Sequence, residues 1–153
     1  MLLNLLPRHS CLIKNISLFK IKNVKAFKYA ISDKDGIAPF YLATHRGYDS
    51  LYKQDLTIGT EKVISCKTYS LSSIFRLFSL AEVDLIKIDV EGAEDLVLKG
   101  AEPIIERVRT WVVEIHDLRK EKEIINYFHL HGFKVMKLGR IHIIALRRRD
   151  NVR

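Results

Sequence analysis

Two short apolar runs in the second half of the chain each end in charged or polar side chains. Val83–Ile88 is followed directly by Asp89, and Thr110–Ile115 includes Glu114 and is followed by His116. Apolar runs of this length, bounded by turn residues, are typical of strands that are buried in a sheet. The pattern therefore predicts two buried strands whose carboxyl ends hold acidic groups and an imidazole.

Helical spacing and turn residues predict the elements around these two strands. Between them we expect a helix over 94–99 that Gly100 ends, and a short helix from Pro103 to Val108. A longer helix is predicted over 119–131, with Gly132 at its end. The final strands, 133–138 and 141–146, are separated only by Gly139 and Arg140, which is too short for a parallel crossover, so they must form an antiparallel hairpin.

The first half of the chain has a less regular pattern. Leu12, Ile16 and Phe19 have helical spacing, and residues 32–36 are rich in turn formers. The elements expected here are a helix over 11–19, strands over 24–31, 37–42 and 62–68, a polar connection over 44–60, and a helix over 71–80. The near-continuous apolar strands of the whole chain favour an α/β fold with a mostly parallel sheet that is covered on both faces.

Length and composition place the chain among ordinary globular proteins. It has 153 residues, of which 48% are hydrophobic and 29% charged, and this favours one domain over 1–153 and excludes a disordered chain. Within it, 1–11 is an atypical start, 12–146 forms the body and 147–153 is a basic tail. The longest apolar stretches are too short for a membrane helix or a signal peptide, so we expect no membrane partner and a cytoplasmic protein.

Charge and cysteine content add two further expectations. The net charge of +8 is concentrated at the two ends, because residues 31–133 contain 13 basic and 17 acidic residues. Basic ends can bind nucleic acid, but no nucleic-acid-binding motif accompanies them, and we favour a solvated surface. Cys11 and Cys66 have neither disulfide-framework nor zinc-site spacing. Two buried thiols are expected, and no metal site is predicted.

The polar side chains at the strand ends are the best candidates for chemistry. Ligands of open α/β sheets bind beyond the carboxyl ends of the strands, where Asp89, Glu91, Glu114 and His116 would collect. Carboxylates and an imidazole at one sheet edge suit a polar ligand or proton transfer. An alternative is that Asp89 and Glu91 only cap the helix that follows them. For His116, packing at a strand end is the corresponding structural alternative.

The segment DLIKIDVEGAEDLVLKGA, residues 84–101, resembles the signature of FkbM-type methyltransferases. AISDKDG (30–36), RGYDSL (46–51), TYSLSSIF (68–75) and WVVEIH (111–116) resemble further segments of the same family, so the likeness extends from about residue 12 to residue 146. The resemblance implies a Rossmann-like methyltransferase fold, a mostly parallel sheet with a carboxy-terminal antiparallel hairpin. It also implies methyl transfer from S-adenosylmethionine to a small-molecule or sugar hydroxyl.

Site roles follow from this resemblance. Asp89 or His116 would remove the proton of the acceptor hydroxyl, and Glu114 would orient the acceptor. Ser32, Asp33 and Glu91 would contact S-adenosylmethionine.

The chain departs from the family pattern at its start. The family opens with a strand and a glycine-rich turn, followed by a strand that ends in an acid, and nothing similar precedes Cys11. We therefore expect a truncated member that lacks the first two strands, with an exposed strand edge and a tendency to self-associate. The alternatives to a methyltransferase are a non-catalytic interaction module and a basic nucleic-acid-binding domain.

Overall fold

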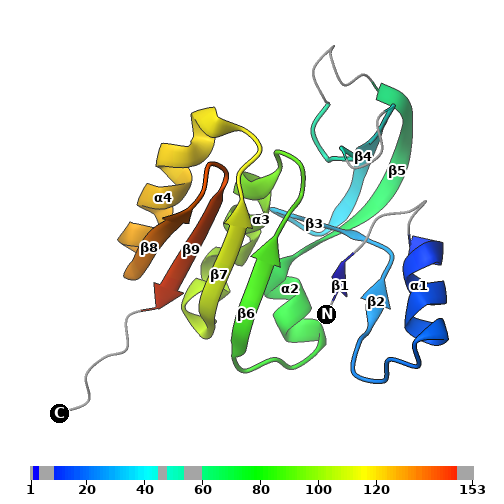
Figure 1. Ribbon diagram of the computed structural model, residues 1–153, viewed down its shortest axis with the longest axis horizontal. Helices are drawn as coiled ribbons and strands as arrows, with labels where there is room; N and C mark the ends of the chain where they lie inside the picture. The colour runs from blue at the N-terminus through cyan, green and yellow to red at the C-terminus, as the bar shows by residue number, and fades with distance from the viewer. Residues whose placement is uncertain (1, 4–8, 45–47, 54–59, 148–153) are drawn as a thin grey trace.

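The computed structural model describes residues 2–3, 9–44, 48–53 and 60–147. Strands and helices are both distributed along the chain, with a run of four strands, β2 to β5, in its first half (Figure 1). The elements of the first half are β1 (Leu2–Leu3), α1 (His9–Leu18), β2 (Ala26–Phe27), β3 (Ala30–Ser32), β4 (Gly36–Ala43), β5 (Thr60–Ser70) and α2 (Leu71–Leu77). Those of the second half are β6 (Val83–Ile88), α3 (Glu94–Ala101), the 3-10 helix η1 (Glu102–Arg107), β7 (Val108–Glu114), the 3-10 helix η2 (Leu118–Lys120), α4 (Glu121–Leu130), β8 (Phe133–Leu138) and β9 (His142–Arg147).

The largest sheet has the strand order β6-β7-β9-β8. β6 and β7 are parallel, with Ile86 opposite Trp111, whereas β9 is antiparallel to both of its neighbours. The predicted hairpin of the last two strands is therefore confirmed. Gly139 begins the turn with a φ of 67°, a left-handed conformation that glycine adopts without strain.

The expectation of a mostly parallel sheet is wrong, because the sheets are mixed. A second sheet has the order β3-β5-β4, in which β3 is parallel to β5 and β4 is antiparallel to it, and β1 pairs with β2 in parallel. Among the described residues, three strand pairs are parallel and three are antiparallel. β4 and β5 follow each other without an intervening helix, which favours antiparallel pairing.

The single strand predicted over 24–31 is in fact two short strands in different sheets. The chain bends at Lys28 and Tyr29, so β2 pairs with β1 and β3 pairs with β5. The Tyr29 ring is buried at the bend, where it packs against Phe27 and Tyr69 at centroid distances of 5.4 and 4.9 Å. The division of the predicted strand thus coincides with the burial of this ring.

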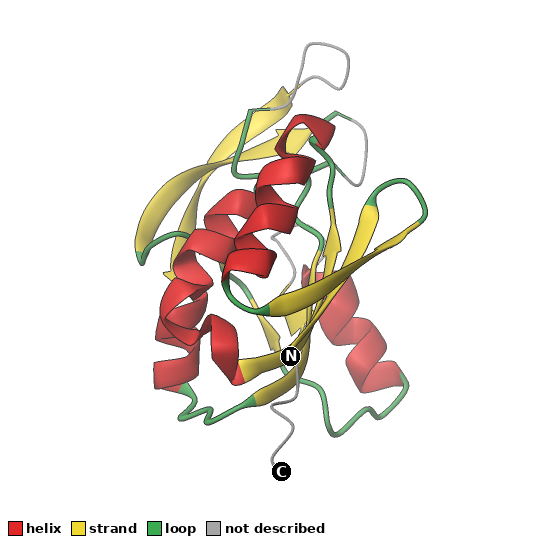
Figure 2. Ribbon diagram, turned by 90° about the vertical axis from the view of Figure 1, so that its left-hand side faces the viewer, coloured by secondary structure: helices red, strands yellow, loops and turns green. Residues whose placement is uncertain are grey.

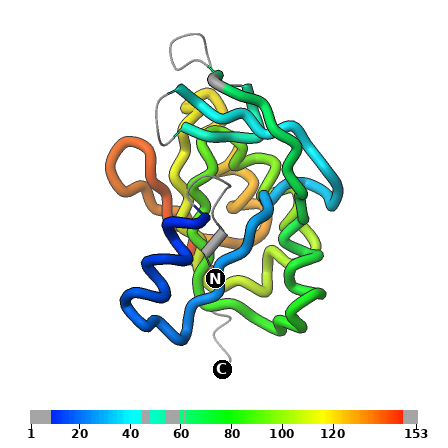
Figure 3. The backbone as a smooth tube through the Cα atoms, turned by 90° about the vertical axis from the view of Figure 1, so that its right-hand side faces the viewer, coloured from blue at the N-terminus to red at the C-terminus, as the bar shows by residue number. Residues whose placement is uncertain are grey.

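Helices cover one face of the largest sheet rather than both (Figure 2). On the covered face, Trp111 and Val113 of β7 are fully buried, and the Trp111 ring lies 5.9 Å from the Phe128 ring of α4. On the other face, Leu85 of β6 is 55% exposed. α1 lies on this second side of the sheet (Figures 2 and 3), but it buries none of its residues. The prediction of two covered faces is therefore wrong for the described residues.

Gly100 does not end α3, which continues to Ala101. The glycine serves a close approach between α3 and β3 instead. A Cβ atom at this position would lie 2.1 Å from the Ser32 carbonyl oxygen and 3.2 Å from the Ser70 Cβ atom. The absent side chain therefore allows the helix to contact the strand backbone directly.

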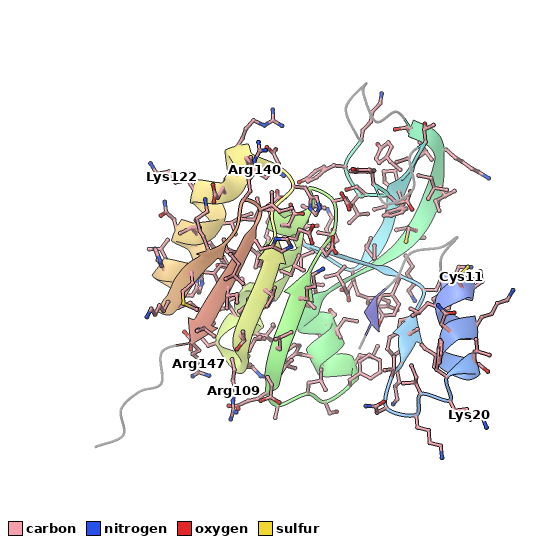
Figure 4. All side chains as sticks on the ribbon, viewed as in Figure 1. Cys11, Lys20, Arg109, Lys122, Arg140 and Arg147 are labelled. Carbon is pink, nitrogen blue, oxygen red and sulfur yellow. The ribbon has the colours of Figure 1, made fainter. Side chains whose placement is uncertain are left out.

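The two cysteines differ in exposure. Cys66 is buried in β5, as expected, whereas Cys11 is exposed on α1 (Figure 4). The prediction of two buried thiols fails at Cys11 because α1 buries no residue. Among the described residues, no helix has the length and apolar character needed to cross a membrane. Parts of the predicted polar connection (45–47 and 54–59) and most of the basic tail (148–153) lie outside the described residues.

Among the described residues, β6 pairs with β7 on one side and has no partner strand on the other. Self-association through an exposed edge stays a prediction. Analytical ultracentrifugation at several protein concentrations checks it: a concentration-dependent shift toward a dimer supports it, and a constant monomer contradicts it.

Asp35 is expected to stabilise the start of α2. Its Oδ1 accepts hydrogen bonds from the Ser70 backbone N–H (2.9 Å) and hydroxyl (3.3 Å), and Ser70 in turn caps the helix through the N–H of Ser73. We expect Asp35→Ala to lower the free energy of unfolding by about 1 kcal/mol at pH 7, the usual cost of losing such a hydrogen bond. Urea denaturation measures this loss.

The loss of stability in Asp35→Ala should depend on pH. The Ser70 backbone hydrogen bond lowers the pKa of Asp35, so the folded state favours the carboxylate. The stabilisation is then present above the pKa of the unfolded state, about 3.9, and disappears as the pH falls through the lower folded value. A difference between Asp35→Ala and the wild type that stays constant from pH 7 to pH 2.5 would contradict this role. Asp84→Ala, at an exposed position of β6, is the control.

Candidate functional site

Four polar side chains meet where β6 and β7 end. The two strands are parallel neighbours, so the residues after β6 lie beside those at the end of β7. His116 Nε2 lies 3.4 Å from Glu91 Oε2, 3.6 Å from Glu114 Oε1 and 4.0 Å from Asp89 Oδ1. We call Asp89, Glu91, Glu114 and His116 the strand-end cluster. All four were predicted as site residues, and the structure brings them together.

The turn between β6 and α3 directs Glu91 into the cluster. Glu91 has a φ of 52° and Gly92 a φ of 96°, so two consecutive residues adopt conformations with positive φ. A non-glycine residue in this region is uncommon and is found at tight turns and functional sites. Burial raises the pKa of Glu91, and the nearby His116 opposes this rise.

Glu94 holds the imidazole from the opposite side. Its side chain is fully buried, and its Oε1 accepts a hydrogen bond from the Gly92 backbone N–H (2.9 Å) and lies 3.0 Å from His116 Nδ1. When His116 Nδ1 donates to Glu94, the other ring nitrogen, Nε2, faces the three carboxylates. Glu94 Oε2 is buried and has no hydrogen-bond partner among the described residues. The hydrogen bond to Glu94 raises the pKa of His116, the other carboxylates add to the rise, and burial opposes it.

Two further cationic or titratable groups contact the cluster. Lys87 Nζ lies 2.7 Å from Asp89 Oδ2 and 3.4 Å from Glu114 Oε2, and the hydrogen bond to Asp89 raises the pKa of Lys87. His142 Nε2 lies 3.2 Å from Glu114 Oε2, because His142 is opposite Glu114 in the pairing of β9 with β7. The cluster is thus lined from three strands.

The helix-capping alternative for Asp89 and Glu91 is wrong. The N-cap residue of α3 is Ala93, and no side chain caps this helix end. Glu94 and Asp95 occupy the first helical turn instead, where acidic groups are favourable. Asp89 and Glu91 face His116, so the structure places them in the cluster rather than at the helix terminus.

Ser32 and Asp33 lie at the end of β3. The Ser32 hydroxyl donates to Asp33 Oδ1 (3.1 Å), and Asp33 Oδ2 lies 3.7 Å from Lys99 of α3. Both residues line a hollow of about 200 Å³, which is smaller than the 300–1,000 Å³ of typical ligand pockets. The structure thus gives these two predicted cofactor residues partners on β3 and α3, whereas Glu91 faces His116.

An α/β chain with carboxylates and an imidazole gathered beyond two parallel strand ends has the arrangement of an enzyme site for polar ligands. Comparison with protein families gives the particular class: the model of the methyltransferase FkbM domain matches residues 9–135. This chain belongs to the FkbM methyltransferase family. Comparison with curated proteins and with solved structures found no match.

Proposed function

We propose that the protein catalyses methyl transfer to a hydroxyl group of a small molecule or sugar. Membership of a methyltransferase family supports the reaction class and implies S-adenosylmethionine as the donor. The observation that supports a hydroxyl acceptor is the strand-end cluster, in which His116 Nε2 faces three carboxylates while Glu94 holds Nδ1. A hydroxyl must lose its proton to become a good nucleophile, and this is general-base work.

Two groups of the cluster are suited to accept that proton. Asp89 is the more accessible, with 41% of its side chain exposed, and it follows β6 directly. His116 has the fixed ring orientation that an efficient base needs. Glu91 and Glu114 flank the ring at 3.4 and 3.6 Å and would orient the acceptor or a bound ligand. We assign proton removal to Asp89 or His116, and positioning to the two glutamates.

The three residues predicted to contact the cofactor each have partners within the protein. Ser32 is almost fully buried beneath Gly100 of α3, and Asp33 is paired with Lys99. Glu91 faces His116 in the strand-end cluster. S-adenosylmethionine, when bound, would supply an activated methyl group and leave alignment and proton removal to the protein.

Calorimetric titration of S-adenosylmethionine and S-adenosylhomocysteine into the folded chain tests the proposal. Saturable one-to-one binding of both, with no binding of ATP as a nucleoside control, supports a methyltransferase. The absence of binding heat from a sample with a normal unfolding transition contradicts the proposal for this chain. Where methyl transfer to a hydroxyl acceptor follows, Asp89→Asn and His116→Gln should reduce it at least tenfold, and Asp84→Asn should not.

A further inference from the structure

We propose that Asp89, Glu114 and His116 bind a divalent metal ion, with Mn²⁺ as the best-suited ion. The spacing of cysteines and histidines along the chain predicted no such site. The three residues come from the ends of β6 and β7 and are adjacent only because these strands pair in parallel.

The three side chains offer donor atoms at close to the required separation. One atom from each residue lies within 4.8 Å of the others. Three donors spaced evenly around an ion at about 2.2 Å lie at most about 3.8 Å apart, and only two donors on opposite sides of the ion reach about 4.4 Å. Ion binding therefore needs the donor atoms to draw together by up to about 1 Å. Asp89 and Glu114 can make this movement by side-chain rotation, since neither is fully buried.

The histidine is oriented as a metal-binding histidine is. Ligand histidines in proteins donate their second ring nitrogen to a carboxylate or carbonyl, which fixes the tautomer and the direction of the lone pair. Glu94 is this partner for His116, because its Oε1 lies 3.0 Å from Nδ1. The Glu94 carboxylate is completely buried, is directed at the ring of the cluster histidine, and has a second oxygen without a partner among the described residues. A fully buried, half-satisfied carboxylate is costly unless positive charge lies near it.

Three carboxylates around the proposed ion have more negative charge than the lysine beside them balances. Asp89, Glu94 and Glu114 lie within 4.0 Å of His116, and among the described residues Lys87 is the one lysine or arginine in an ion pair with them. With these carboxylates ionised and the histidines neutral, as metal binding requires, the net charge of this group is −2. A divalent cation would balance this charge. It would compete with Lys87, which contacts both proposed carboxylate ligands.

The ligand set favours a particular kind of ion. Carboxylates suit Mg²⁺, Ca²⁺ and Mn²⁺, whereas imidazole suits transition metals, so two carboxylates with one imidazole favour Mn²⁺ among the hard divalent ions. The binding site follows from the donor geometry alone. Its use in catalysis rests on the proposed function. With His116 Nε2 on the ion, proton removal would fall to the second oxygen of Asp89, and the ion would polarise the acceptor hydroxyl and lower its pKa.

Titration of MnCl₂ into the EDTA-treated, dialysed chain tests the site. The readouts are calorimetry and the electron paramagnetic resonance signal of free Mn²⁺, and no S-adenosylmethionine is present. Failure of cofactor binding therefore leaves this result unaffected, and the two proposals can fail separately. We expect one saturable site in the wild type, and binding at least tenfold weaker in Asp89→Asn and Glu114→Gln.

Three further variants make the test specific. Asp84→Asn removes the other carboxylate of β6, which is exposed and pairs with Arg109, and should bind Mn²⁺ within twofold of the wild type. Lys87→Met should bind several-fold more tightly, because the competing ammonium is gone. Glu94→Gln should bind about tenfold more weakly, because an amide partner makes the imidazole ligand less basic than a carboxylate partner does. No saturable binding by the wild type, or equal losses in Asp84→Asn and Asp89→Asn, would overturn the proposal.

Discussion

Replacing Gly100 with alanine is expected to destabilise the protein by about 3 kcal/mol, although the same change in a helix normally stabilises it by up to about 1 kcal/mol. The added Cβ would lie 2.1 Å from the Ser32 carbonyl oxygen. That atom belongs to the backbone of β3, so no side-chain rotation relieves the overlap. Helix α3 must move away from the strand, and the buried contacts around Ala101 and Leu98 loosen with it.

Chemical denaturation of Gly100→Ala beside Lys99→Ala checks this expectation. Lys99 is the preceding residue of α3 and is 71% exposed, so its replacement reports the effect of an ordinary surface change on the same helix. We expect Lys99→Ala to remain within about 0.5 kcal/mol of the wild type. A Gly100→Ala variant that is as stable as the wild type would show that α3 and β3 are not held at the close distance described above.

Glu94→Ala is expected to lower the free energy of unfolding by a similar amount, about 3 kcal/mol. It removes the oxygen that accepts hydrogen bonds from two donors, and it leaves a small void. The Gly92 N–H and the His116 Nδ1–H would both lose their partner, inside a region where Glu94 itself is fully buried. Glu94→Gln keeps a carbonyl oxygen at the same place. We expect it to stay within about 1 kcal/mol of the wild type, since it also removes a half-satisfied carboxylate.

The same variants should differ in the tautomer of the His116 ring. Nitrogen chemical shifts of the imidazole, measured in EDTA at a pH where the ring is neutral, distinguish the two tautomers. The wild type and Glu94→Gln should have the proton on Nδ1, and Glu94→Ala should give a mixture of tautomers. One unchanged tautomer in Glu94→Ala would mean that Glu94 does not orient the ring, whatever the stability of the variant.

Local pattern was enough to predict β6, β7 and the final hairpin. β6 and β7 are short, largely apolar runs, and only two residues separate the predicted strands of the hairpin, so length alone excluded a crossover. The errors came from contacts between distant parts of the chain. The predicted strand over 24–31 divides at Tyr29, whose ring packs against Tyr69 of β5. Gly100 was interpreted as a helix end because its partner, the backbone of Ser32, is 68 positions earlier in the sequence.

The candidate site was predictable as far as strand ends could be recognised. The two apolar runs mark where the strands end, and at these ends stand Asp89, Glu91, Glu114 and His116. Glu94 was missed because a glutamate in the first helical turn is normally solvated, and only its burial reveals another role. Lys87 had a visible signal, since residues two apart in a strand share a face with each other. His142 had none, because its position depends on the register of β9 against β7.

Ser50 connects the second sheet to the turn that supports the cluster. Its backbone pairs with Tyr41 of β4, and its buried hydroxyl donates to the carbonyl of Val90, just after β6, at 3.3 Å. Local opening of β4 at this point would also break this contact with the segment that positions Glu91. In hydrogen-exchange terms, the amides of Tyr41, Ser50 and residues 91–94 should exchange as one cooperative unit with similar opening free energies. Motion at the edge of one sheet would then set how long the cluster of the other sheet stays assembled.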